Sequence, residues 1–298
     1  MNQNAHDPKQ WLRESLQRFD REAQRTTIAT PRYRCRVIRW GSGPPLVFIH
    51  GLSDEARSFA QVMAALSSDF TCFAYELPNG LEDHAAIARE QHDDHVTDLL
   101  ALLDHFHLES TAILGSSFGS TITLAALARA PGRFTRAILQ GGFARRPLGL
   151  VEKALARFAR LCPGRMGSLP GRRYAMARLD KPAFVAAPPE AYEFFLSCAG
   201  KTPIAAAGRR ALILSQLDLR PLLPTIPQPV LMIGGDRDTI VPCCYEEETL
   251  AGLRDVRRLE LPLCGHYPQY THPLRMAAAI RSFLHGNSGL VDEPENHS

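Results

Sequence analysis

Three short runs that are typical of strands are each followed by residue types that could take part in nucleophilic catalysis. The clearest is Ser117, at the centre of Gly-Ser-Ser-Phe-Gly (115–119), which follows the run TAIL and precedes the helical pattern TITLAALARA. Small residues permit the sharp turn that exposes a serine hydroxyl at the start of a helix. The pattern favours a nucleophilic serine. The alternative is a glycine-rich turn whose serine caps the helix.

A serine hydroxyl becomes a strong nucleophile only when a base takes its proton, and the base needs a group that orients it. His266 follows the run RLELP, and two acidic candidates, Asp236 and Asp238, follow PVLMIGG. Both stretches are expected to be loops at the carboxyl ends of strands, where open α/β sheets place their functional sites. The three loops can therefore converge. Asp218 is a more distant third acid.

Strand and helix patterns alternate along most of the chain. Strands are predicted at 32–40, 45–50, 71–77, 111–115, 135–141, 229–235 and 256–262. Helices are predicted at 8–25, 58–67, 86–107, 118–130, 244–253 and 272–285. Several strands are continuous apolar runs, as expected for strands buried on both faces of a parallel sheet. The order indicates an α/β fold with a mostly parallel central sheet flanked by helices.

One interval interrupts this alternation. Residues 144–217 show helical patterns near 148–162, 188–198 and 204–216 but no convincing strand, so they are interpreted as an inserted helical cap. Residues 32–143 and 218–285 then form the core, 1–31 a helical N-terminal extension and 286–298 a polar tail. The 298 residues are thus interpreted as one fold that carries an insertion.

Taken in order, the motifs resemble the α/β-hydrolase fold superfamily over nearly all of residues 32–285. His50-Gly51 is similar to the family's oxyanion-loop HG, residues 76–80 (ELPNG) to its D-x-P-G turn, and residues 235–242 to its G-x-x-D-x-x-x-P. The turn around Ser117 and Gly265-His266 complete the set. The turn at 76–80 departs from the pattern in having Glu and Asn where Asp and Gly are usual. The HG loop lacks the extra glycines of HGGG lipases, which implies a narrow oxyanion loop.

Carried over residue by residue, the resemblance implies a triad of Ser117 as nucleophile, Asp238 as acid and His266 as base. In the family the acid falls three residues after the glycine that ends its strand. Here that glycine is Gly235, which favours Asp238 over Asp236.

The resemblance also implies an oxyanion hole of two backbone N–H groups. One belongs to Phe118 and the other to Leu52, with Ser53 as the alternative to Leu52. His50 is expected to be structural.

The type of nucleophile narrows the reaction. Haloalkane dehalogenases and epoxide hydrolases of the family use a carboxylate, whereas position 117 is Ser. The resemblance therefore implies a serine hydrolase that cleaves a carboxylic ester or related small acyl compound through an acyl-serine intermediate. The same triad could serve carbon–carbon bond hydrolysis, lyase or acyltransferase chemistry. An inactive ligand-binding receptor is the second alternative, and no metal or organic cofactor is implied.

The composition argues against other classes. Lys and Arg total 34 against 31 Asp and Glu, so the net charge of +3 gives no sign of nucleic-acid binding. The first twenty residues mix acids and bases, and no run of about 18 apolar residues occurs, so neither a secretory signal nor an integral membrane segment is expected. Seven Cys without a C-x-x-C pair indicate reduced thiols. A cytoplasmic protein is the expectation.

Positive charge is concentrated in the insertion. Residues 144–181 contain ten Lys or Arg against two acids, a balance of +8. The helix predicted there has an apolar stripe formed by Val151, Leu155, Phe158 and Cys162. Three cations, Lys153, Arg157 and Arg160, lie roughly opposite this stripe. The cations are favoured as the solvated face of the helix. The alternative is a basic surface that steers acidic substrates such as acyl-CoA, or that touches an anionic membrane.

His92-Asp93-Asp94-His95 offers four side chains that can bind metals. On a helix, His92 and His95 share a face while Asp93 points elsewhere. A solvated helix face is therefore favoured over a metal site.

Overall fold

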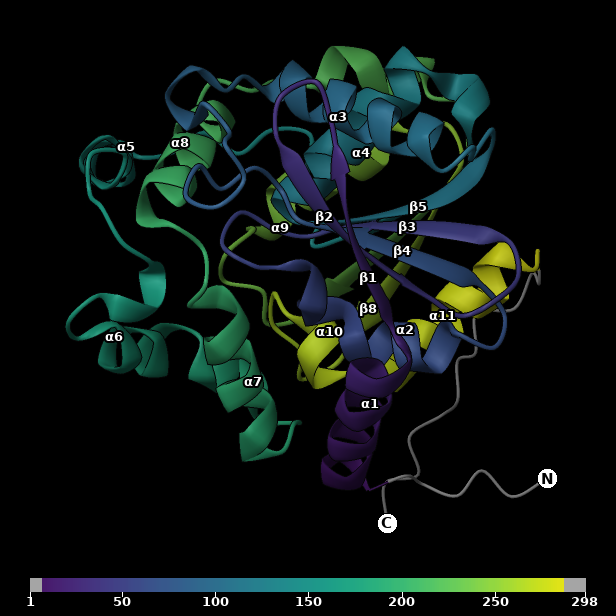
Figure 1. Cartoon of the computed structure of the whole chain (residues 1–298), viewed down its shortest axis with the longest axis horizontal. Coiled ribbons are helices and arrows are strands. Elements are labelled where there is room, and N and C mark those ends of the chain that lie inside the picture. Colours follow the sequence, from purple (N-terminus) through teal and green to yellow (C-terminus); the bar gives the residue numbers. More distant parts are fainter. Residues whose placement is uncertain (1–6, 287–298) are drawn as a thin grey trace.

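The computed structural model describes residues 7–286, so the polar tail predicted at 286–298 lies outside the described residues except for its first position. Its centre is one sheet, shown in Figure 1, with the strands β1 Gln24–Ala29, β2 Arg34–Trp40, β3 Pro45–Ile49, β4 Thr71–Tyr75, β5 Thr111–Ser116, β6 Phe134–Gln140, β7 Val230–Gly235 and β8 Val256–Leu261. The strand order is β1-β2-β4-β3-β5-β6-β7-β8. Only β1 and β2 are antiparallel to their neighbours, so the predicted mostly parallel sheet is confirmed.

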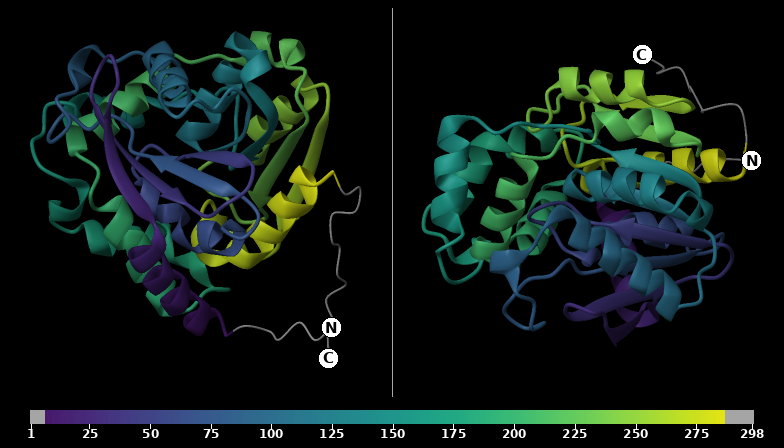
Figure 2. Two further views of the ribbon diagram at one scale, coloured as in Figure 1. Left: turned by 45° about the vertical axis from the view of Figure 1, so that its right-hand side comes forward. Right: turned by 90° about the horizontal axis from the view of Figure 1, so that it is seen from above.

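Helices cover both faces of this sheet and extend beyond one edge (Figures 1 and 2). They are α1 Pro8–Glu22, α2 Ala60–Leu66, α3 His92–His105, α4 Phe118–Arg129, α5 Leu150–Ala159, α6 Arg172–Leu179, α7 Pro189–Ala199, α8 Ile204–Leu214, α9 Cys243–Gly252, α10 Pro268–Thr271 and α11 Pro273–Leu284. One hydrophobic core joins the sheet to α1, α2 and α11, and a second joins it to α3 and α4. Because both faces are covered, every residue of β4 and β5 is buried.

The N-terminal segment differs from the prediction. The helix begins where Asp7-Pro8 predicts, with the Asp7 side chain accepting a hydrogen bond from the Lys9 amide (3.0 Å), but it ends at Glu22. Residues 24–29 then form β1, for which no strand is predicted. Only Ile28 of this strand is buried, because β1 is an edge strand that pairs with β2 alone. Its sequence therefore lacks the apolar alternation that predicts a strand.

The interval between β6 and β7 contains α5 to α8 and no strand of the sheet. These helices lie together beside the sheet, at the left of Figure 1. Helix α7 packs into the main body, where the Phe195 ring lies 5.4 Å from the Tyr270 ring of α10. Helix α6 is not predicted by the sequence.

The apolar stripe of α5 does not face the core as expected, although Arg157 and Arg160 are exposed as predicted. Val151 is 73% exposed and Phe158 is 70% exposed, so the predicted core-facing stripe points into solvent. The buried side of α5 is formed by Ala156, which approaches α8 closely. A Cβ added to Gly208 of α8 would lie 2.8 Å from the Ala156 carbonyl oxygen. This contact has room for small residues only, which is why the large apolar side chains of α5 point outward.

The solvated face predicted for His92 and His95 is also wrong. His95 is buried with its ring 5.2 Å from the Phe118 ring, and His92 Nε2 lies 2.9 Å from Thr121 Oγ1. Helix α3 packs on α4 through this histidine pair, which buries His95 completely and His92 in part.

Candidate active site

Ser117 occupies a strained turn between β5 and α4. Its φ is 51° and its ψ −113°, a conformation that residues with a side chain rarely adopt. The turn is held by close backbone contacts: the Ser117 amide donates to the Gln140 carbonyl (2.8 Å). A Cβ on Gly119 would lie 2.3 Å from the Ile49 carbonyl oxygen, so glycine is required there. The fixed turn presents the serine at the carboxyl edge of the parallel strands.

His266 and Asp238 lie in contact at the same edge. His266 Nδ1 is 2.6 Å from Asp238 Oδ2, while Asp238 Oδ1 accepts hydrogen bonds from the amides of Ile240 (2.8 Å) and Val241 (2.9 Å). Burial opposes ionisation of Asp238, but the charge and hydrogen bond of His266 and the two amides hold the pKa of this carboxyl below its ordinary value. With Nδ1–H donating to the carboxylate, Nε2 is left as the basic nitrogen.

His266 Nε2 is buried and has no hydrogen-bond partner within the described residues. The ring lies against the backbone of Gly141, where an added Cβ would be 2.7 Å from His266 Cε1. The ring is therefore held on one edge by Asp238 and on another by a glycine that leaves it room.

Of the three aspartates considered from the sequence, Asp238 is the one that contacts His266. Asp236 accepts a hydrogen bond from the Cys264 amide (3.0 Å), which fixes the loop that carries His266. Asp218 is exposed and forms an ion pair with Arg220 (2.6 Å).

The HG loop passes beside the serine. A Cβ added to Gly51 would lie 3.5 Å from Ser117 Cβ. The amides of Leu52, Ser53 and Phe118 donate no hydrogen bond within the described residues. They remain available to an acceptor in the site, so the choice between Leu52 and Ser53 stays open.

His50 binds backbone groups through both ring nitrogens. The Leu77 amide donates to Nε2 (3.0 Å), so the proton lies on Nδ1, which contacts the Gly51 carbonyl (2.8 Å). Burial, with the charge of Arg210, lowers the pKa of His50 to about 3. The ring therefore stays neutral and fixes the start of the HG loop.

Arg210 is a residue that sequence reasoning missed. It reaches from α8 to the HG loop and donates to the carbonyls of Leu52 (2.8 Å) and Pro78 (2.6 Å), with 1% of its surface exposed. No local pattern distinguishes it from the neighbouring Arg209. Because the Leu52 carbonyl and the Ser53 amide belong to one peptide plane, Arg210 also fixes the direction of that amide.

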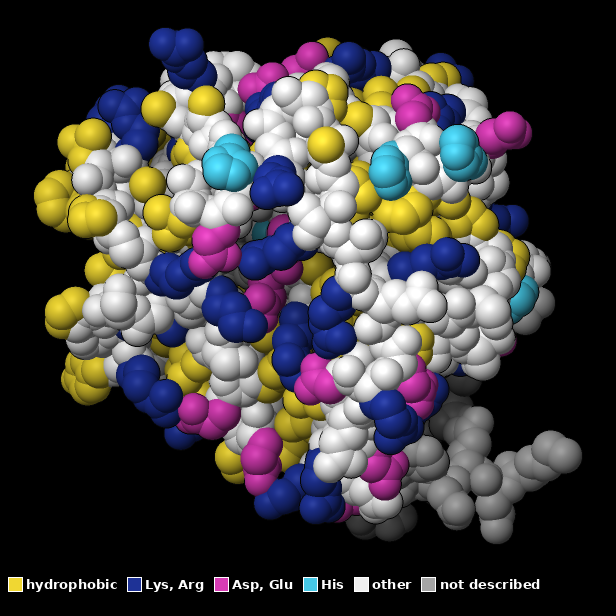
Figure 3. All heavy atoms as spheres, viewed as in Figure 1, with side chains coloured by type: hydrophobic (Ala, Val, Ile, Leu, Met, Phe, Trp, Pro, Cys, Tyr) yellow, Lys and Arg dark blue, Asp and Glu magenta, His cyan; other side chains and the backbone are white. Residues whose placement is uncertain are grey.

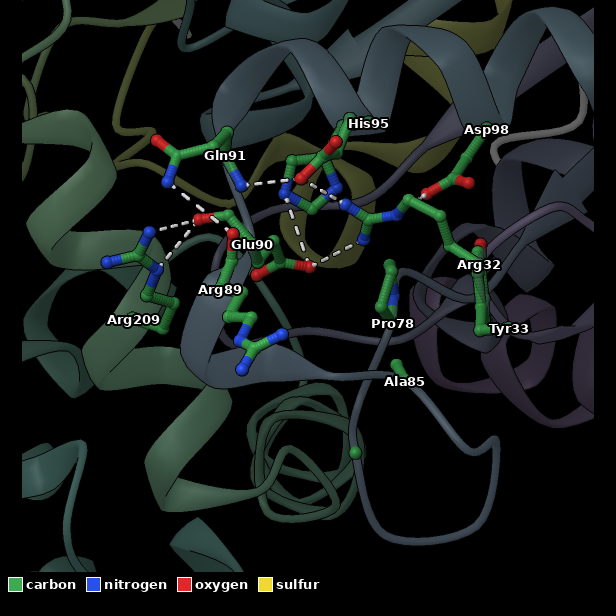
Figure 4. A network of polar contacts seen from close by, with 12 residues as sticks. Arg32, Tyr33, Pro78, Ala85, Arg89, Glu90, Gln91, His95, Asp98 and Arg209 are labelled. Carbon is green, nitrogen blue, oxygen red and sulfur yellow. Dashed lines mark hydrogen bonds and ion pairs between the residues drawn. The ribbon is translucent and has the colours of Figure 1, made fainter.

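A second polar network ties α8 to the core beside this loop (Figure 4). Both Nε and Nη2 of Arg209 donate to the Glu90 carbonyl, the former at 2.8 Å. The Glu90 carboxylate is buried between Arg32 (3.4 Å) and His95 (3.6 Å). Burial raises the pKa of Glu90 to about 7, although the charges of Arg210 and Arg32 act in the opposite direction.

Ser117 and His266 line one cavity of about 640 Å³ between the sheet edge and the α5–α8 segment. Most of its other walls are apolar and come from that segment: Leu148, Leu155, Ala156, Ala159, Met166, Met176, Phe195, Ile204, Ala207, Ala211 and Leu214.

The charged groups that line the cavity are each engaged by neighbours. Arg146 bonds the Ile240 carbonyl (2.8 Å) and Glu152 (2.9 Å). The carboxyl of Asp180 accepts from the Tyr267 hydroxyl (3.0 Å), and burial raises its pKa. The chemical features of the cavity are therefore an apolar chamber with a serine, a histidine and free amides at one end.

Within the described residues, no group of three or more His, Cys, Asp or Glu side chains is arranged to hold a metal ion. No helix in that part of the chain is long and apolar enough to cross a membrane.

Comparison with known proteins places the chain among proteins of similar sequence and fold. It is 25% identical over 265 residues to haloalkane dehalogenase 2 of Mycobacterium tuberculosis, covering 84% of this chain and 91% of that protein. It is 24% identical over 197 residues to 3-oxoadipate enol-lactonase 2 of Acinetobacter baylyi, covering 66% of this chain and 72% of that protein. The structure of a thermophilic esterase from Thermogutta terrifontis superimposes with a TM-score of 0.72 at 22% identity, covering 88% of this chain and 98% of the esterase.

The sequence profile of the alpha/beta hydrolase fold matches residues 44–273, which include the serine turn, the HG loop and the His266 loop. This match spans most of the chain, and it agrees with the strand order and with the resemblance of the motifs. The chain belongs to the α/β-hydrolase fold family.

Proposed function

We propose that the protein is a serine hydrolase that cleaves a carboxylic ester or related acyl compound through an acyl-serine intermediate. The observation that carries the proposal is the 2.6 Å contact between His266 and Asp238, with His266 Nε2 buried, unpartnered and in the same cavity as Ser117. A basic nitrogen left without a partner, in the same cavity as a strained serine, is what deprotonation of that hydroxyl requires.

In the proposed mechanism His266 Nε2 takes the Ser117 proton while the serine oxygen attacks the acyl carbon. Asp238 holds the imidazole in the required tautomer and stabilises the imidazolium that forms. The carbonyl oxygen gains negative charge, which the amides of Phe118 and Leu52, or Ser53, stabilise. His266 then gives its proton to the leaving group, and water activated by the same nitrogen releases the acid.

We further propose that the acyl group is apolar and uncharged. The chamber beside Ser117 is lined largely by alkyl and aromatic side chains. Its one arginine, Arg146, is already bonded to Glu152 and to a backbone carbonyl. An acidic acyl group would find no unpaired cation among the described lining residues, and its desolvation would be unfavourable.

Dehalogenase chemistry is not supported by the residue at the nucleophile position, despite the similarity to haloalkane dehalogenase 2. That reaction uses a carboxylate to displace halide, whereas this chain has Ser117. The similarity to an enol-lactonase favours acyl chemistry, because a lactone is an internal ester.

The test is turnover of p-nitrophenyl esters and labelling by a fluorophosphonate probe, each compared with Ser117→Ala. The variant is expected to lose activity by at least about 10³-fold and to lose all labelling. Product analysis of the parent enzyme separates hydrolysis from acyl transfer, because only hydrolysis releases the free acid when an alcohol is also present. Equal activity and labelling of the two proteins would overturn the mechanism.

A further inference from the structure

Exposed apolar side chains gather on the α5–α6 part of the molecule. Among the described residues eleven large apolar side chains are exposed, and eight of these lie between positions 150 and 185. The most exposed are Leu150 at 87%, Leu161 at 74% and Val151 at 73%. Figure 3 shows hydrophobic spheres along the left-hand edge, where α5 and α6 lie in Figure 1. A monomer rarely leaves so much contiguous apolar surface in water without a use for it.

Helix α5 cannot bury this surface by turning round. Its inner side touches α8 through small residues, and Gly208 there leaves no room for a larger side chain facing Ala156. The outer stripe, defined as Leu150, Val151, Leu155, Phe158 and Leu161, is therefore a permanent outward face. No other element of the described residues covers it.

Cations border the outer stripe along one side. Arg157 lies next to Leu161 at helical spacing, and Lys153 and Arg160 continue the same strip. None of these three forms an ion pair within the described residues. The one acid of α5, Glu152, is bonded to Arg146 and to the Gly149 amide. The surface thus combines an apolar stripe with uncompensated positive charge.

Charge selects between the possible occupants of this surface. A second copy of the chain docked through the same patch would bring together Lys153, Arg157 and Arg160 of both copies, none of which has an acidic partner among the described residues. An acidic protein would satisfy the cations but would have to offer apolar surface beside its acids. An anionic lipid bilayer supplies both negative headgroups and an apolar layer beneath them.

We propose that the outer stripe of α5 docks on an anionic lipid bilayer, with the helix lying along the membrane surface. The apolar side chains enter the boundary between headgroups and acyl chains. Lys153, Arg157 and Arg160 extend to the headgroups, as long basic side chains do at such boundaries. This inference concerns attachment and does not depend on the proposed reaction.

The docked orientation has a consequence for the cavity. Leu155 is 63% exposed and also lines the cavity, whereas Ala156 and Ala159 of the same helix form its inner wall. A bilayer against α5 therefore lies one helix thickness from the apolar chamber.

The experiment is co-sedimentation of the full chain with lipid vesicles. Binding is expected to vesicles of phosphatidylcholine and phosphatidylglycerol in equal parts, to be weak or absent with phosphatidylcholine alone, and to fall as salt rises. The triple change Val151→Ser, Phe158→Ser and Leu161→Ser is expected to weaken binding at least about tenfold. Arg157→Glu with Arg160→Glu should weaken it by at least about fivefold for each cation lost.

Control variants carry changes of the same kind away from α5. Leu81→Ser with Leu274→Ser removes two exposed apolar side chains, and Arg13→Glu with Arg254→Glu makes the same change in net charge. These variants should bind the mixed vesicles as the parent does. Absence of binding by the parent, or an equal loss in the control variants, would overturn the proposal. So would a parent dimer in sedimentation equilibrium that the triple serine variant converts to monomer.

Discussion

Asp238 and Asp236 are two residues apart in one loop, yet they meet different partners. Asp238 contacts the His266 ring, whereas Asp236 accepts a hydrogen bond from the Cys264 amide. If the proposed triad is correct, an Asn at position 238 lacks the carboxylate that holds the His266 imidazole. An Asn at position 236 keeps an amide oxygen that can still accept the hydrogen bond from the Cys264 amide.

Asp238→Asn is therefore expected to lower kcat for an activated ester by about 10² to 10⁴-fold at neutral pH. Asp236→Asn is the matched control and should stay within a few-fold of the parent, because the amide oxygen replaces the carboxylate oxygen. Steady-state kinetics of the purified proteins measures both. Similar losses in the two variants would contradict the assignment of Asp238.

Arg210 gives a second prediction for single residues. Arg210→Met leaves the buried carbonyls of Leu52 and Pro78 without their charged donor, which should cost about 2 to 4 kcal/mol of unfolding free energy. Because the peptide between Leu52 and Ser53 is no longer fixed, kcat should fall at least about tenfold with a smaller change in KM.

The control for Arg210 is Arg209→Met, which removes donors to the Glu90 carbonyl but none to the HG loop. Denaturant unfolding and ester kinetics are measured on both variants under conditions in which circular dichroism shows them folded. A normal kcat in Arg210→Met would mean that the arginine serves stability alone.

These residues also show what a sequence can reveal at this scale. Ser117, Asp238 and His266 each stand in a short local motif after a strand, so their placement at one edge of the sheet could be predicted from the order and resemblance of the motifs. Arg210 has no such motif, since its partners Leu52 and Pro78 lie on loops far away in sequence. Its role depends on how α8 packs, and a single sequence does not contain that information in readable form.

At the scale of elements, the network around Glu90 joins α3, α8 and the segment before β2. Burial raises the pKa of Glu90 to about 7 from an ordinary value of 4.5, so between these two pH values the unfolded chain has released a proton that the folded chain still holds. The stability contributed by this group is therefore fully present below pH 4.5 and is lost as the pH rises through about 7.

Glu90→Gln removes this titration. We compare the unfolding free energy of the variant with that of the parent. The variant's value minus the parent's is expected to rise by up to about 3 kcal/mol as the pH rises from 4.5 to above about 7. Denaturant unfolding of both proteins at pH 5 and pH 8 measures it. Glu109→Gln, at an exposed position, should give the same difference at both pH values. If the difference in unfolding free energy between Glu90→Gln and the parent does not change with pH, the Glu90 carboxyl of the folded parent titrates as it does in the unfolded chain.

Elements were predictable where burial on the sheet dictates composition. The strands β3 to β7 are apolar runs, and their positions follow directly from the sequence. The edge strand β1 escaped prediction because it is exposed apart from Ile28. The orientation of α5 was predicted wrongly because an apolar stripe normally faces a core, and here the contact with Gly208 admits only small residues.

At the scale of the whole molecule, the α5–α8 segment is joined to the sheet and its helices by polar bonds and by a shared hydrophobic cluster. Arg146 and Lys201 reach acceptors on the loops after β7 and β3, in addition to the bonds of Arg209 and Arg210. Helix α7 contributes Phe194 and Phe195 to the same hydrophobic cluster as α1 and α2. Deleting the segment would therefore expose part of that core, so its effect on selectivity is better tested by single substitutions that change the cavity.

Ala211 offers such a substitution, because it lies on α8 at the cavity wall. Ala211→Phe fills part of the roughly 640 Å³ chamber, and if the chamber holds the acyl group, esters with long chains should lose kcat/KM at least about tenfold while acetyl and propionyl esters change little. Ala205→Phe, on the same helix but outside the cavity lining, is the matched control and should leave the ranking of esters unchanged. A panel of p-nitrophenyl esters of increasing chain length measures the profile. If both variants lose activity uniformly over the panel, the acyl chain binds elsewhere and the α8 wall is not the element that limits its length.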